Sequence, residues 1–492
     1  MTERTTALPV TAGTPLPQPV PSERCLRCDV CCRFPERTSP LRPYFSREEI
    51  DRAVAQGISP AAFPDSAGSR IDLIPHPAGD GFICPAFDVT TSRCMIYDVR
   101  PLDCRLYPFA LMRPPQGDGL LLGWDRLCPY LREEADAMLP IALAPEIARH
   151  LDAAAIVDEH PALVGAFQDA VWVLEPLTPA WTPGAADRSA GLRPIDDGDV
   201  RRLRVFLERS VESDSSARHP AAWLMWRPLM NFFWLELDRG RAVVAEQGGG
   251  YFAPVPPVAN RGESFPALCA DLLAQLGRLN GGHGAARIER MSDAQRPIIE
   301  STGLRCRAQG EEYLYDRRAL AELRGDDYKS ARWNCNQAAR RFHPSYEPYR
   351  PADLIECLRL CAAWRRLKER RPSADGYAAA LLADSFYAHW QALAHAADWG
   401  LRARVVRIGG EIKGYTVGAP LNEWTMAVLH EVADPRCPGV GAWLFREWCR
   451  EFSEYAVINA MDDSDLPALR AAKTRYRPMR RLPFYLAVLA PE

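Results

Sequence analysis

The chain of 492 residues lacks any uninterrupted apolar run of about 18 residues, the length that a membrane-spanning helix requires. Its first 24 residues are rich in Thr and Pro, and they lack the apolar core of a secretory signal peptide. The two absences predict a cytoplasmic protein without stable membrane insertion. Disulfides are rare in that compartment, so clustered cysteines there favour metal or redox chemistry.

An excess of charge of one sign is also absent. The formal net charge is −3 at pH 7, so no overall positive field favours a nucleic-acid coat, and any contact with a polyanion has to be local. No internal repeat is obvious by residue identity. The length predicts about three domains of ordinary size, with enough chain for a hydrophobic core.

Cysteine, by contrast, is abundant and concentrated near one end. Of the 15 cysteines, the early ones begin with the run CLRCDVCC, in which four thiols crowd into a few residues. Such crowding disfavours disulfides among them, because a disulfide needs separated and oriented Cα atoms, whereas a soft metal accepts it. The predicted metal ligands are Cys25, Cys28, Cys31, Cys32, Cys84, Cys94, Cys104 and Cys128.

The identity of the metal stays open at this point. All-thiolate sites suit Zn²⁺ and iron–sulfur clusters alike, and the eight thiols would serve two four-coordinate sites or one cluster with spares. Arg100 and Arg105 flank Cys104, and nearby cations are expected to lower its thiol pKa. The alternative is that the later cysteines are small buried hydrophobic residues, which applies most to Cys128, beyond the motif proper.

The cysteine pattern resembles a known family. CLRCDVCC at 25–32 and CPAFDVTTSRCMIYDVRPLDCRLYPF at 84–109 together resemble the CxxCxxCC family, a proposed zinc- or iron-chelating domain, over about residues 22–135. The pattern is also similar to that of flagellin lysine methylases. The resemblance implies bound zinc or iron, including a 4Fe–4S cluster.

The remaining chain predicts an α/β or α+β region. We expect a disordered tail at 1–21, the cysteine domain at 22–135, a helical segment and linker at 136–193, and two subdomains at 194–310 and 311–492. β-Branched and aromatic residues predict strands at 232–238, 241–247, 403–410, 412–420 and 424–432. Helical periodicity predicts helices at 265–279, 351–371 and 440–455, and it places Cys357 and Cys361 in the core.

A glycine-bearing loop lies between the strand at 424–432 and the helix that follows. Arg436, Gly439 and Gly441 form an RxxGxG pattern. Glycines let a backbone approach a pyrophosphate, and a helix N-terminus offers free N–H groups, so the pattern predicts a phosphate site. It resembles the acyl-CoA loop of the GNAT acetyltransferase superfamily. A glycine-rich turn without a ligand is the alternative.

A wider resemblance covers about residues 194–490. The segments at 219–238, 311–342 and 455–485 resemble the C-terminal domain of phosphatidylglycerol lysyltransferases. That resemblance implies a tandem pair of GNAT-like folds that moves an aminoacyl group from tRNA to an acceptor. The cysteine domain stands where those enzymes carry a membrane-embedded half, which argues against a phospholipid acceptor and favours a small-molecule or protein amine.

The resemblance to acetyltransferases implies catalytic roles for two residues. Glu431 ends the strand before the loop, where a carboxylate can act as general base, and Tyr476 falls near the position of a general acid. Arg470 and Lys473 lie three apart on a helix and could hold phosphates of CoA or tRNA. A solvated carboxylate, a core tyrosine and an exposed basic edge are the respective alternatives.

A basic and aromatic run at 324–342 could contact tRNA, since cations bind phosphates and aromatic rings stack on bases. An exposed connecting helix would look similar. Three functional hypotheses follow: an acyl- or aminoacyl-transferase using acyl-CoA or aminoacyl-tRNA, an iron–sulfur protein-modifying enzyme, and a non-catalytic metal-binding protein. The RxxGxG loop and Glu431 favour the first.

Overall fold

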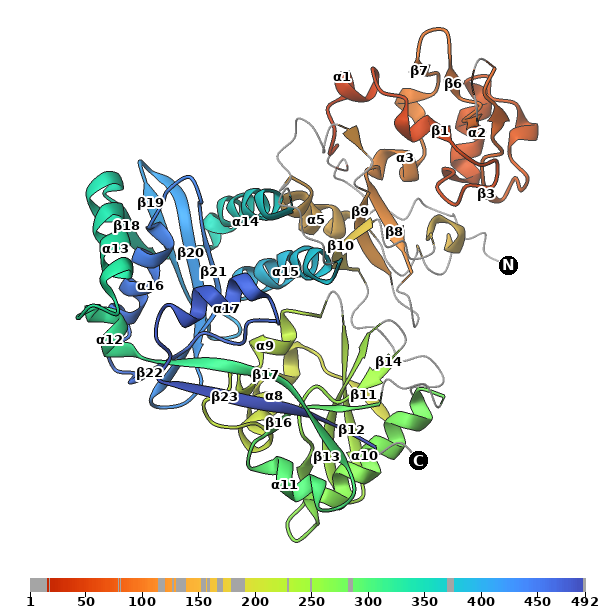
Figure 1. The fold of residues 1–492 in the computed structure, drawn as a ribbon. Coiled ribbons are helices and arrows are strands. Elements are labelled where there is room, and N and C mark those ends of the chain that lie inside the picture. Colours follow the sequence, from red (N-terminus) through yellow and green to blue (C-terminus); the bar gives the residue numbers. More distant parts are fainter. Residues whose placement is uncertain are drawn as a thin grey trace. The chain divides into compact units, whose positions relative to one another are not determined.

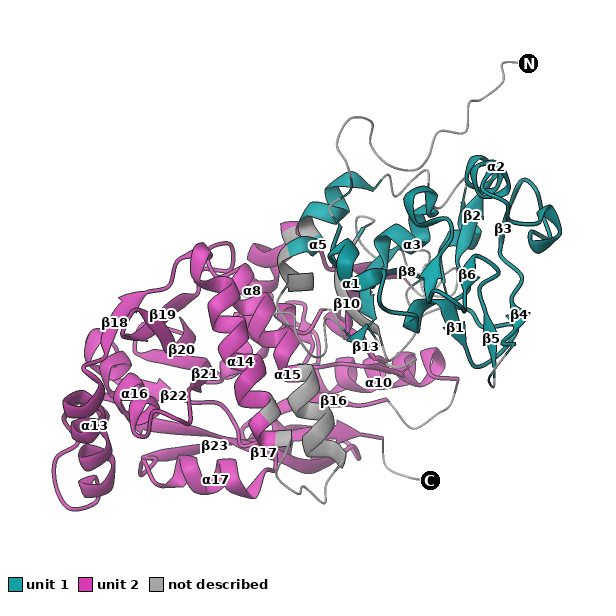
Figure 2. Ribbon diagram, turned by 90° about the horizontal axis from the view of Figure 1, so that it is seen from above, with its two compact units in different colours: residues 1–184 teal, residues 185–492 magenta. Residues whose placement is uncertain are grey.

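The computed structural model describes residues 16, 18–77, 79, 81–113, 120–125, 128–129, 139–151, 156, 160–165, 171–177, 191–227, 230–247, 250–281, 286–369 and 376–489. The chain forms two compact units, Met1–Gly184 and Ala185–Glu492 (Figure 2). The predicted disordered tail at 1–21 and the predicted linker lie largely outside the described residues.

Unit 1 consists of short elements (Figure 1). Its helices are α1 (Ser22–Cys25), α2 (Arg47–Ala55), α3 (Leu102–Leu106) and α5 (Leu139–His150), with 3-10 turns η1 (Val30–Cys32), η2 (Pro60–Ala62), η3 (Tyr97–Val99) and η4 (Pro161–Leu163). Its strands are β1 (Arg33–Phe34), β2 (Tyr44–Ser46), β3 (Gly68–Arg70), β4 (Ile74–Pro75), β5 (Phe82–Ile83), β6 (Phe87–Asp88), β7 (Arg93–Cys94), β8 (Phe109–Met112), β9 (Leu121–Asp125) and β10 (Val171–Pro176).

A buried carboxylate joins two helices of unit 1. Glu49 forms a capping box with Ser46 at the start of α2, and its Oε1 also accepts a hydrogen bond of 2.8 Å from the backbone N–H of Leu102 in α3. The N-terminal turns of α2 and α3 therefore share one anion, as their dipoles favour. This arrangement fixes the position of Cys104, which lies in α3.

The predicted helical segment at 136–193 is helical in part. Helix α5 lies there, but Val171–Pro176 is the strand β10, which pairs antiparallel with β9 and completes the three-stranded sheet β10-β9-β8. The sequence VWVLEP of β10 is rich in residues that favour strands, and pairing with β9 satisfies its backbone groups.

Unit 2 contains the long elements. Its helices are α8 (Val200–Ser210), α9 (Ala221–Leu224), α10 (Phe265–Leu279), α11 (Gln295–Glu300), α12 (Arg317–Glu322), α13 (Lys329–Phe342), α14 (Leu354–Glu369), α15 (Gly376–Ala394), α16 (Val440–Glu451) and α17 (Pro467–Thr474), with η5 (Asp197–Asp199), η6 (Ser216–Arg218) and η7 (Pro351–Asp353). Its strands are β11 (Leu192–Pro194), β12 (Asn231–Leu237), β13 (Gly240–Gln247), β14 (Gly250–Phe252), β15 (Val258–Ala259), β16 (Ile288–Ser292), β17 (Arg305–Asp316), β18 (Ser345–Pro348), β19 (Arg402–Ile408), β20 (Glu411–Pro420), β21 (Thr425–Ala433), β22 (Val457–Asn459) and β23 (Arg480–Val488).

These strands form two sheets. The first has the order β11-β12-β13-β14 with β15 added on β13, and the second has the order β16-β23-β17-β22-β21-β20-β19-β18. The antiparallel neighbours β17 and β23, which are far apart in the sequence, run from one half of the unit into the other (Figure 1). The predicted subdomain boundary at 310/311 falls inside β17, because this strand of 12 residues is continuous across both halves.

The five strands predicted between 232 and 432 are present as β12, β13, β19, β20 and β21, and the three predicted helices are present as α10, α14 and α16. Cys357 and Cys361 are buried in α14, as their helical face predicts. The expected mixture of helix and sheet is therefore confirmed. No helix among the described residues has the length and apolar character needed to span a membrane.

The candidate site lies on β21 beyond its pairing with β22. The two strands pair in parallel, and this pairing covers Thr425–Ala427 against Val457–Asn459. Further along, β21 continues to Ala433 while it pairs with β20 on its other side. The helix between them, α16, packs its buried face on this sheet, including Leu444 and Trp448. The parallel pairing of β21 with β22 therefore ends at Ala427 and Asn459.

Candidate functional site

The early cysteines gather in unit 1. Cys25 ends α1, Cys31 and Cys32 lie in η1, and Cys94 lies in β7. Cys84 follows β5, and its backbone N–H donates a hydrogen bond of 3.0 Å to the carbonyl of Cys32. This bond joins the two parts of the cysteine pattern, which are far apart in the sequence.

The thiols influence one another's ionisation, with Cys31 as their common neighbour. A hydrogen bond to Cys32 and burial raise the pKa of Cys31 well above its usual value. Burial, followed by Cys94 and Cys31, raises the pKa of Cys84 to about 12. The thiols that interact electrostatically with Cys31 are Cys25, Cys28, Cys32, Cys84, Cys94 and Cys104.

Arg100 and Arg105 do not lower the pKa of Cys104, contrary to the prediction from the sequence. Burial and the Asp103 carboxylate raise the pKa of Cys104 well above its usual value. The Arg100 guanidinium instead opposes the rise at Cys25, Cys31 and Cys94. Arg100 is directed toward Cys25, to which it donates a side-chain hydrogen bond, and its guanidinium lies 3.6 Å from the centre of the Tyr97 ring.

The donor set fits a soft cation. Thiols that are buried and surrounded by other thiols lose protons with difficulty unless a cation compensates the charge, which zinc and iron do in all-thiolate sites. Within the described residues, no three His, Cys, Asp or Glu side chains already stand close enough to bind one ion. Coordination therefore requires the sulfur atoms to draw together. Cys128 is buried. After burial, the charges of Cys31 and Cys128 also help to raise the pKa of Tyr107.

In unit 2 the structure places Glu431 near the end of β21, opposite Thr416 of β20. Its carboxyl Oε2 is buried and has no hydrogen-bond partner among the described residues. A Cβ added at Gly441, in the first turn of α16, would lie 3.9 Å from Oε1. Burial raises the pKa of Glu431 to about 8, so this carboxyl can exchange a proton near neutral pH.

Tyr476 approaches the same carboxyl from the segment after α17. Its ring packs on Phe445 of α16, with ring centres 5.1 Å apart. Burial, followed by the Glu431 carboxylate, raises the pKa of Tyr476. The two residues predicted as catalytic are thus electrostatic neighbours, although they come from different elements. Together they provide a carboxylate that can accept a proton and a phenol that can donate one.

The loop between β21 and α16 is packed tightly. Arg436 is exposed, and its guanidinium forms an ion pair of 2.7 Å with the buried Asp434. Gly439 has φ +87°, and a Cβ there would lie 2.4 Å from the carbonyl oxygen of Asn334 in α13. Cys437 packs against the same apolar cluster as α13. The loop is therefore covered by α13, and its arginine already has an acidic partner.

Arg470 and Lys473, predicted to hold phosphates together, have different partners in the structure. Arg470 donates to Asp463 at 2.8 Å and to Asp465 at 3.0 Å. The Lys473 ammonium is directed inward, where it donates to the carbonyl oxygens of Ala460, at 2.5 Å, and of Asp462. Burial lowers the pKa of Lys473 to about 8. Lys473 therefore fixes the loop after β22 rather than facing a ligand.

Two buried polar clusters were not predicted. In one, the Glu312 carboxylate accepts hydrogen bonds from Arg290, Ser216 and Asn459, at 2.7 Å, 2.7 Å and 2.6 Å. In the other, the imidazoles of His389 and His430 lie 4.0 Å apart. Residues distant in the sequence form both clusters, so only the sheet topology brings them together. No local motif could have revealed them.

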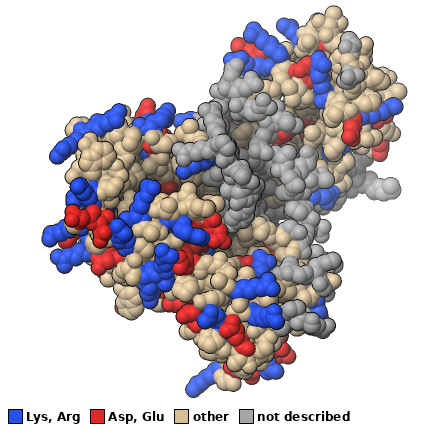
Figure 3. Space-filling view, viewed as in Figure 1, with Lys and Arg blue, Asp and Glu red and all other residues tan. Residues whose placement is uncertain are grey.

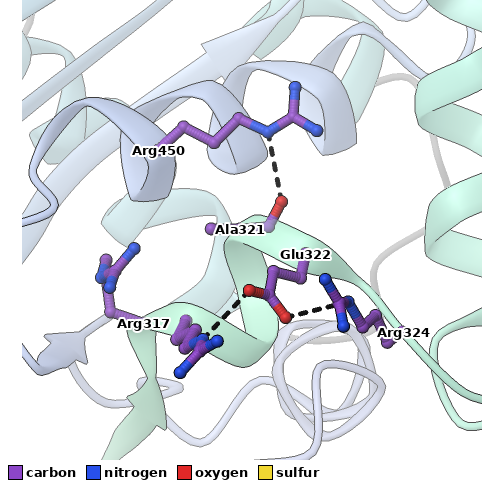
Figure 4. A pocket seen from close by; sticks show the side chains of 6 residues that line it. Arg317, Ala321, Glu322, Arg324 and Arg450 are labelled. Carbon is purple, nitrogen blue, oxygen red and sulfur yellow. Dashed lines mark hydrogen bonds and ion pairs between the residues drawn. The ribbon is translucent and has the colours of Figure 1, made fainter.

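A pocket lined by arginines lies between α12 and the end of α16 (Figure 4). It has a volume of about 460 Å³ and is lined by Arg317, Arg318, Ala321, Glu322, Arg324 and Arg450. Glu322 pairs with Arg318 and Arg324, each at 3.0 Å. Four cations therefore surround one lining carboxylate. Figure 3 shows Lys and Arg interspersed with Asp and Glu on the visible face.

The basic run at 324–342 begins beside this pocket and forms α13. Trp333 is 62% exposed, which leaves its ring available for stacking. Arg340 and Arg341 are exposed near the end of the helix. Arg332 is directed back to the carbonyls of Leu323 and Gly325. The predicted mixture of cations and an exposed ring is thus present in part.

Comparisons with known proteins give two family matches. Residues 209–488 match the family "Phosphatidylglycerol lysyltransferase, C-terminal", and residues 24–132 match the CxxCxxCC family, "Putative zinc- or iron-chelating domain". No curated protein sequence matches the chain. Both predicted family resemblances are confirmed.

Solved structures resemble part of the chain. A conserved protein of unknown function from Bacteroides thetaiotaomicron has a TM-score of 0.52 and 23% identity, covering 61% of this chain and 99% of its own, which shows a shared fold. L-PGS from Bacillus licheniformis has a TM-score of 0.42 and 17% identity, with 58% and 91% covered. A tandem GNAT protein of clavulanic acid biosynthesis has a TM-score of 0.35 and 14% identity, with 61% and 99% covered.

Proposed function

Because this chain belongs to the family of phosphatidylglycerol lysyltransferase C-terminal domains, we propose that it transfers an acyl or aminoacyl group to an amine, with Glu431 as general base and Tyr476 as general acid. The observation that carries the proposal is the buried Glu431 Oε2, which has no partner among the described residues. A carboxyl left without a hydrogen bond in a family of transferases is a candidate proton acceptor for the substrate.

The proposed reaction uses both groups. The amine nitrogen of a small-molecule or protein acceptor attacks the donor carbonyl carbon, and the ionised Glu431 carboxylate takes the amine proton. The bond from the carbonyl carbon to the leaving oxygen or sulfur then breaks, and Tyr476 gives its proton to that atom. The proton moves from Glu431 to the tyrosinate afterwards, which restores both residues. Since the pKa of Glu431 is raised to about 8, the rate should increase with pH up to that region.

The donor is proposed to be aminoacyl-tRNA in preference to acyl-CoA. The packing of α13 over Gly439 and the ion pair of Arg436 with Asp434 oppose entry of a pyrophosphate at the RxxGxG loop. The arginine-lined pocket beside α12 and the exposed Trp333 offer the cations and ring that RNA requires. Binding of acyl-CoA at Arg436, Gly439 and Gly441 is the competing possibility.

The catalytic proposal is tested with labelled aminoacyl-tRNA and acetyl-CoA, each offered with a mixture of primary amines. Glu431→Gln should lower the transfer rate about 100-fold or more, and Tyr476→Phe about 10-fold or more. Glu423→Gln removes an exposed carboxylate just before β21 and serves as the matched control. Unchanged transfer by Glu431→Gln would refute the assignment.

The donor is tested by calorimetry on the intact chain. Arg318→Ala with Arg324→Ala should weaken tRNA binding and leave CoA binding unchanged, because both arginines line the pocket beside α12. Arg436→Ala should weaken CoA binding if the loop is used. Binding of neither tRNA, CoA nor acetyl-CoA by the wild type would remove the transferase proposal.

For unit 1 we propose that the cysteines bind zinc or an iron–sulfur cluster. The mutual effects of seven thiols on ionisation support a shared cation. Purification without oxygen, followed by metal analysis and visible absorption, separates the two: zinc gives a colourless protein, and a cluster gives a brown one. A cluster without any transferase activity would favour the iron–sulfur modifying enzyme; metal without any activity would favour a binding protein.

A further inference from the structure

The edge of the first sheet in unit 2 carries a second cationic hollow, formed by residues that the proposed transfer reaction does not use. It has a volume of about 630 Å³, and it lies between helix α8 and strands β12, β13 and β15. Four arginines line it: Arg201, Arg202, Arg209 and Arg241. We infer that this hollow binds a phosphorylated organic ligand with at least two negative charges and an apolar portion.

Two of the arginines are held in place before any ligand arrives. Arg202 and Arg241 both donate to Oε1 of Glu236, at 3.1 Å and 2.6 Å. Their guanidinium carbons also lie 4.7 Å and 5.7 Å from the centre of the buried Trp234 ring. The shared Glu236 carboxylate and the shared Trp234 ring hold both guanidinium groups in place. Each guanidinium retains further N–H groups that can donate to a ligand. Fixed donors bind an anion with less loss of side-chain entropy.

The other two arginines supply charge without an acidic partner. Arg201 is exposed and has no hydrogen bond or ion pair to any residue in the part of the chain that the structure describes. Arg209 donates to the carbonyl oxygen of Ala259 at 3.4 Å, a long contact. The hollow therefore combines four cations with the single lining carboxylate of Glu236. A ligand with two or three negative charges would balance that excess.

The apolar part of the ligand is inferred from the same hollow. Val205 is 54% exposed on α8, and it lies between arginines one turn away on either side, Arg201 and Arg209. Val258 of β15 contributes a second apolar wall. A hydrocarbon group that lies on these two valines would bury apolar surface, which favours a ligand with an apolar portion.

A small ligand fits better than RNA. The volume lies within the range of small-molecule sites. The aromatic ring nearest the arginines, Trp234, is 1% exposed and cannot stack on a base. The required chemistry, a phosphate ester beside a hydrocarbon group, occurs in soluble metabolites and in anionic phospholipid headgroups. The experiment must separate these two sources.

The test measures binding of three probes by the intact chain: ADP, vesicles of phosphatidylglycerol in phosphatidylcholine, and unacylated tRNA. Arg201→Ala with Arg209→Ala should weaken binding of ADP or of the vesicles about tenfold, and Val205→Asp should weaken it further. Arg402→Ala, an exposed arginine on β19 of the same unit, is the matched control and should change nothing. Loss with ADP identifies a soluble ligand, and loss with vesicles alone identifies a lipid.

Glu236→Gln gives a test of opposite sign. It removes the negative charge but keeps an oxygen that accepts from Arg202 and Arg241, so phosphate binding should tighten about threefold. Nonspecific attraction to surface cations would instead weaken with Arg402→Ala as much as with the loss of one arginine of the hollow. Equal binding by wild type, the double variant and Glu236→Gln overturns the inference, as does a loss confined to tRNA, which would assign the surface to RNA. Neither result bears on transfer at Glu431, because these variants leave that residue intact.

Discussion

Unit 1 and unit 2 differ in the length of their strands and in the features that stabilise them. The strands of unit 1 have two to six residues, whereas β17 of unit 2 has 12 and forms part of an eight-stranded sheet. Unit 2 buries large side chains such as Trp448 and Phe233 in its core. Unit 1 also has an apolar core, which includes Phe45, Ile71 and Leu73, but its strands are short and several thiols pack beside that core. We therefore expect a bound metal to add to the stability of unit 1, whereas unit 2 depends on apolar burial.

Metal removal should therefore produce the largest difference between the units. Replacing Cys25, Cys28, Cys31 and Cys32 together with Ser should abolish metal binding, with a loss on the order of 10 kcal/mol from the folding of unit 1. Calorimetry should show one unfolding transition weakened while the other is retained. Cys306→Ser, in β17 of unit 2, is the control and should keep the metal. Unchanged metal content in the fourfold variant would contradict the assignment.

The next largest effect is expected from the buried carboxyl of unit 2 and depends on pH. Because the pKa of Glu431 is raised to about 8 in the folded state, that state holds a proton which the unfolded chain releases above pH 4.5. The free energy of unfolding should then fall between pH 4.5 and 8, by up to about 5 kcal/mol. Glu431→Gln, which cannot ionise, should lack this decline.

Urea unfolding of wild type and Glu431→Gln at several pH values between 5 and 9 checks this expectation. The variant should be the more stable protein at pH 9 and should approach the wild type at pH 5. Glu423→Gln, which changes an exposed carboxylate, should follow the wild type throughout. Parallel curves for all three proteins would show that Glu431 ionises in the folded state as it does in solvent.

Gly439→Ala should cost about 3 kcal/mol. The residue combines φ +87° with a site where a Cβ would lie 2.4 Å from the Asn334 carbonyl oxygen, so a side chain meets strain and a clash. Gly277→Ala, within α10, meets nothing within 4 Å and should stabilise by about 0.5 to 1 kcal/mol. Chemical unfolding of unit 2 measures both. Equal effects would mean that α13 does not press on the loop.

How much of this could be predicted differs between the two regions. The clustering of the candidate cysteine ligands and the strand β21 follow from local spacing and composition, whereas Glu431 and the loop after it were singled out by the resemblance to acetyltransferases. The effect of Arg100 could not be predicted, because its guanidinium acts on Cys25 and Cys94 rather than on its sequence neighbour Cys104. The burial of Lys473 likewise depends on how the loop after β22 folds over it. Periodicity describes one element at a time and does not specify such contacts between elements.

The smallest expected effect concerns Lys473, the residue whose role the structure changed most. Lys473→Met keeps the length of the side chain but removes the donor to the carbonyls of Ala460 and Asp462. Leaving two carbonyl oxygens without a hydrogen bond costs more free energy than is gained by no longer burying a charge. A net loss of about 1 to 2 kcal/mol in the free energy of unfolding is therefore expected. Urea unfolding measures the loss, and Arg475→Ala, which removes an exposed arginine just after the same helix, should lose less than 1 kcal/mol. If Lys473→Met unfolded no more easily than Arg475→Ala but bound tRNA or CoA less tightly, Lys473 would be a ligand-binding residue after all, and the loop after β22 would be held by other contacts.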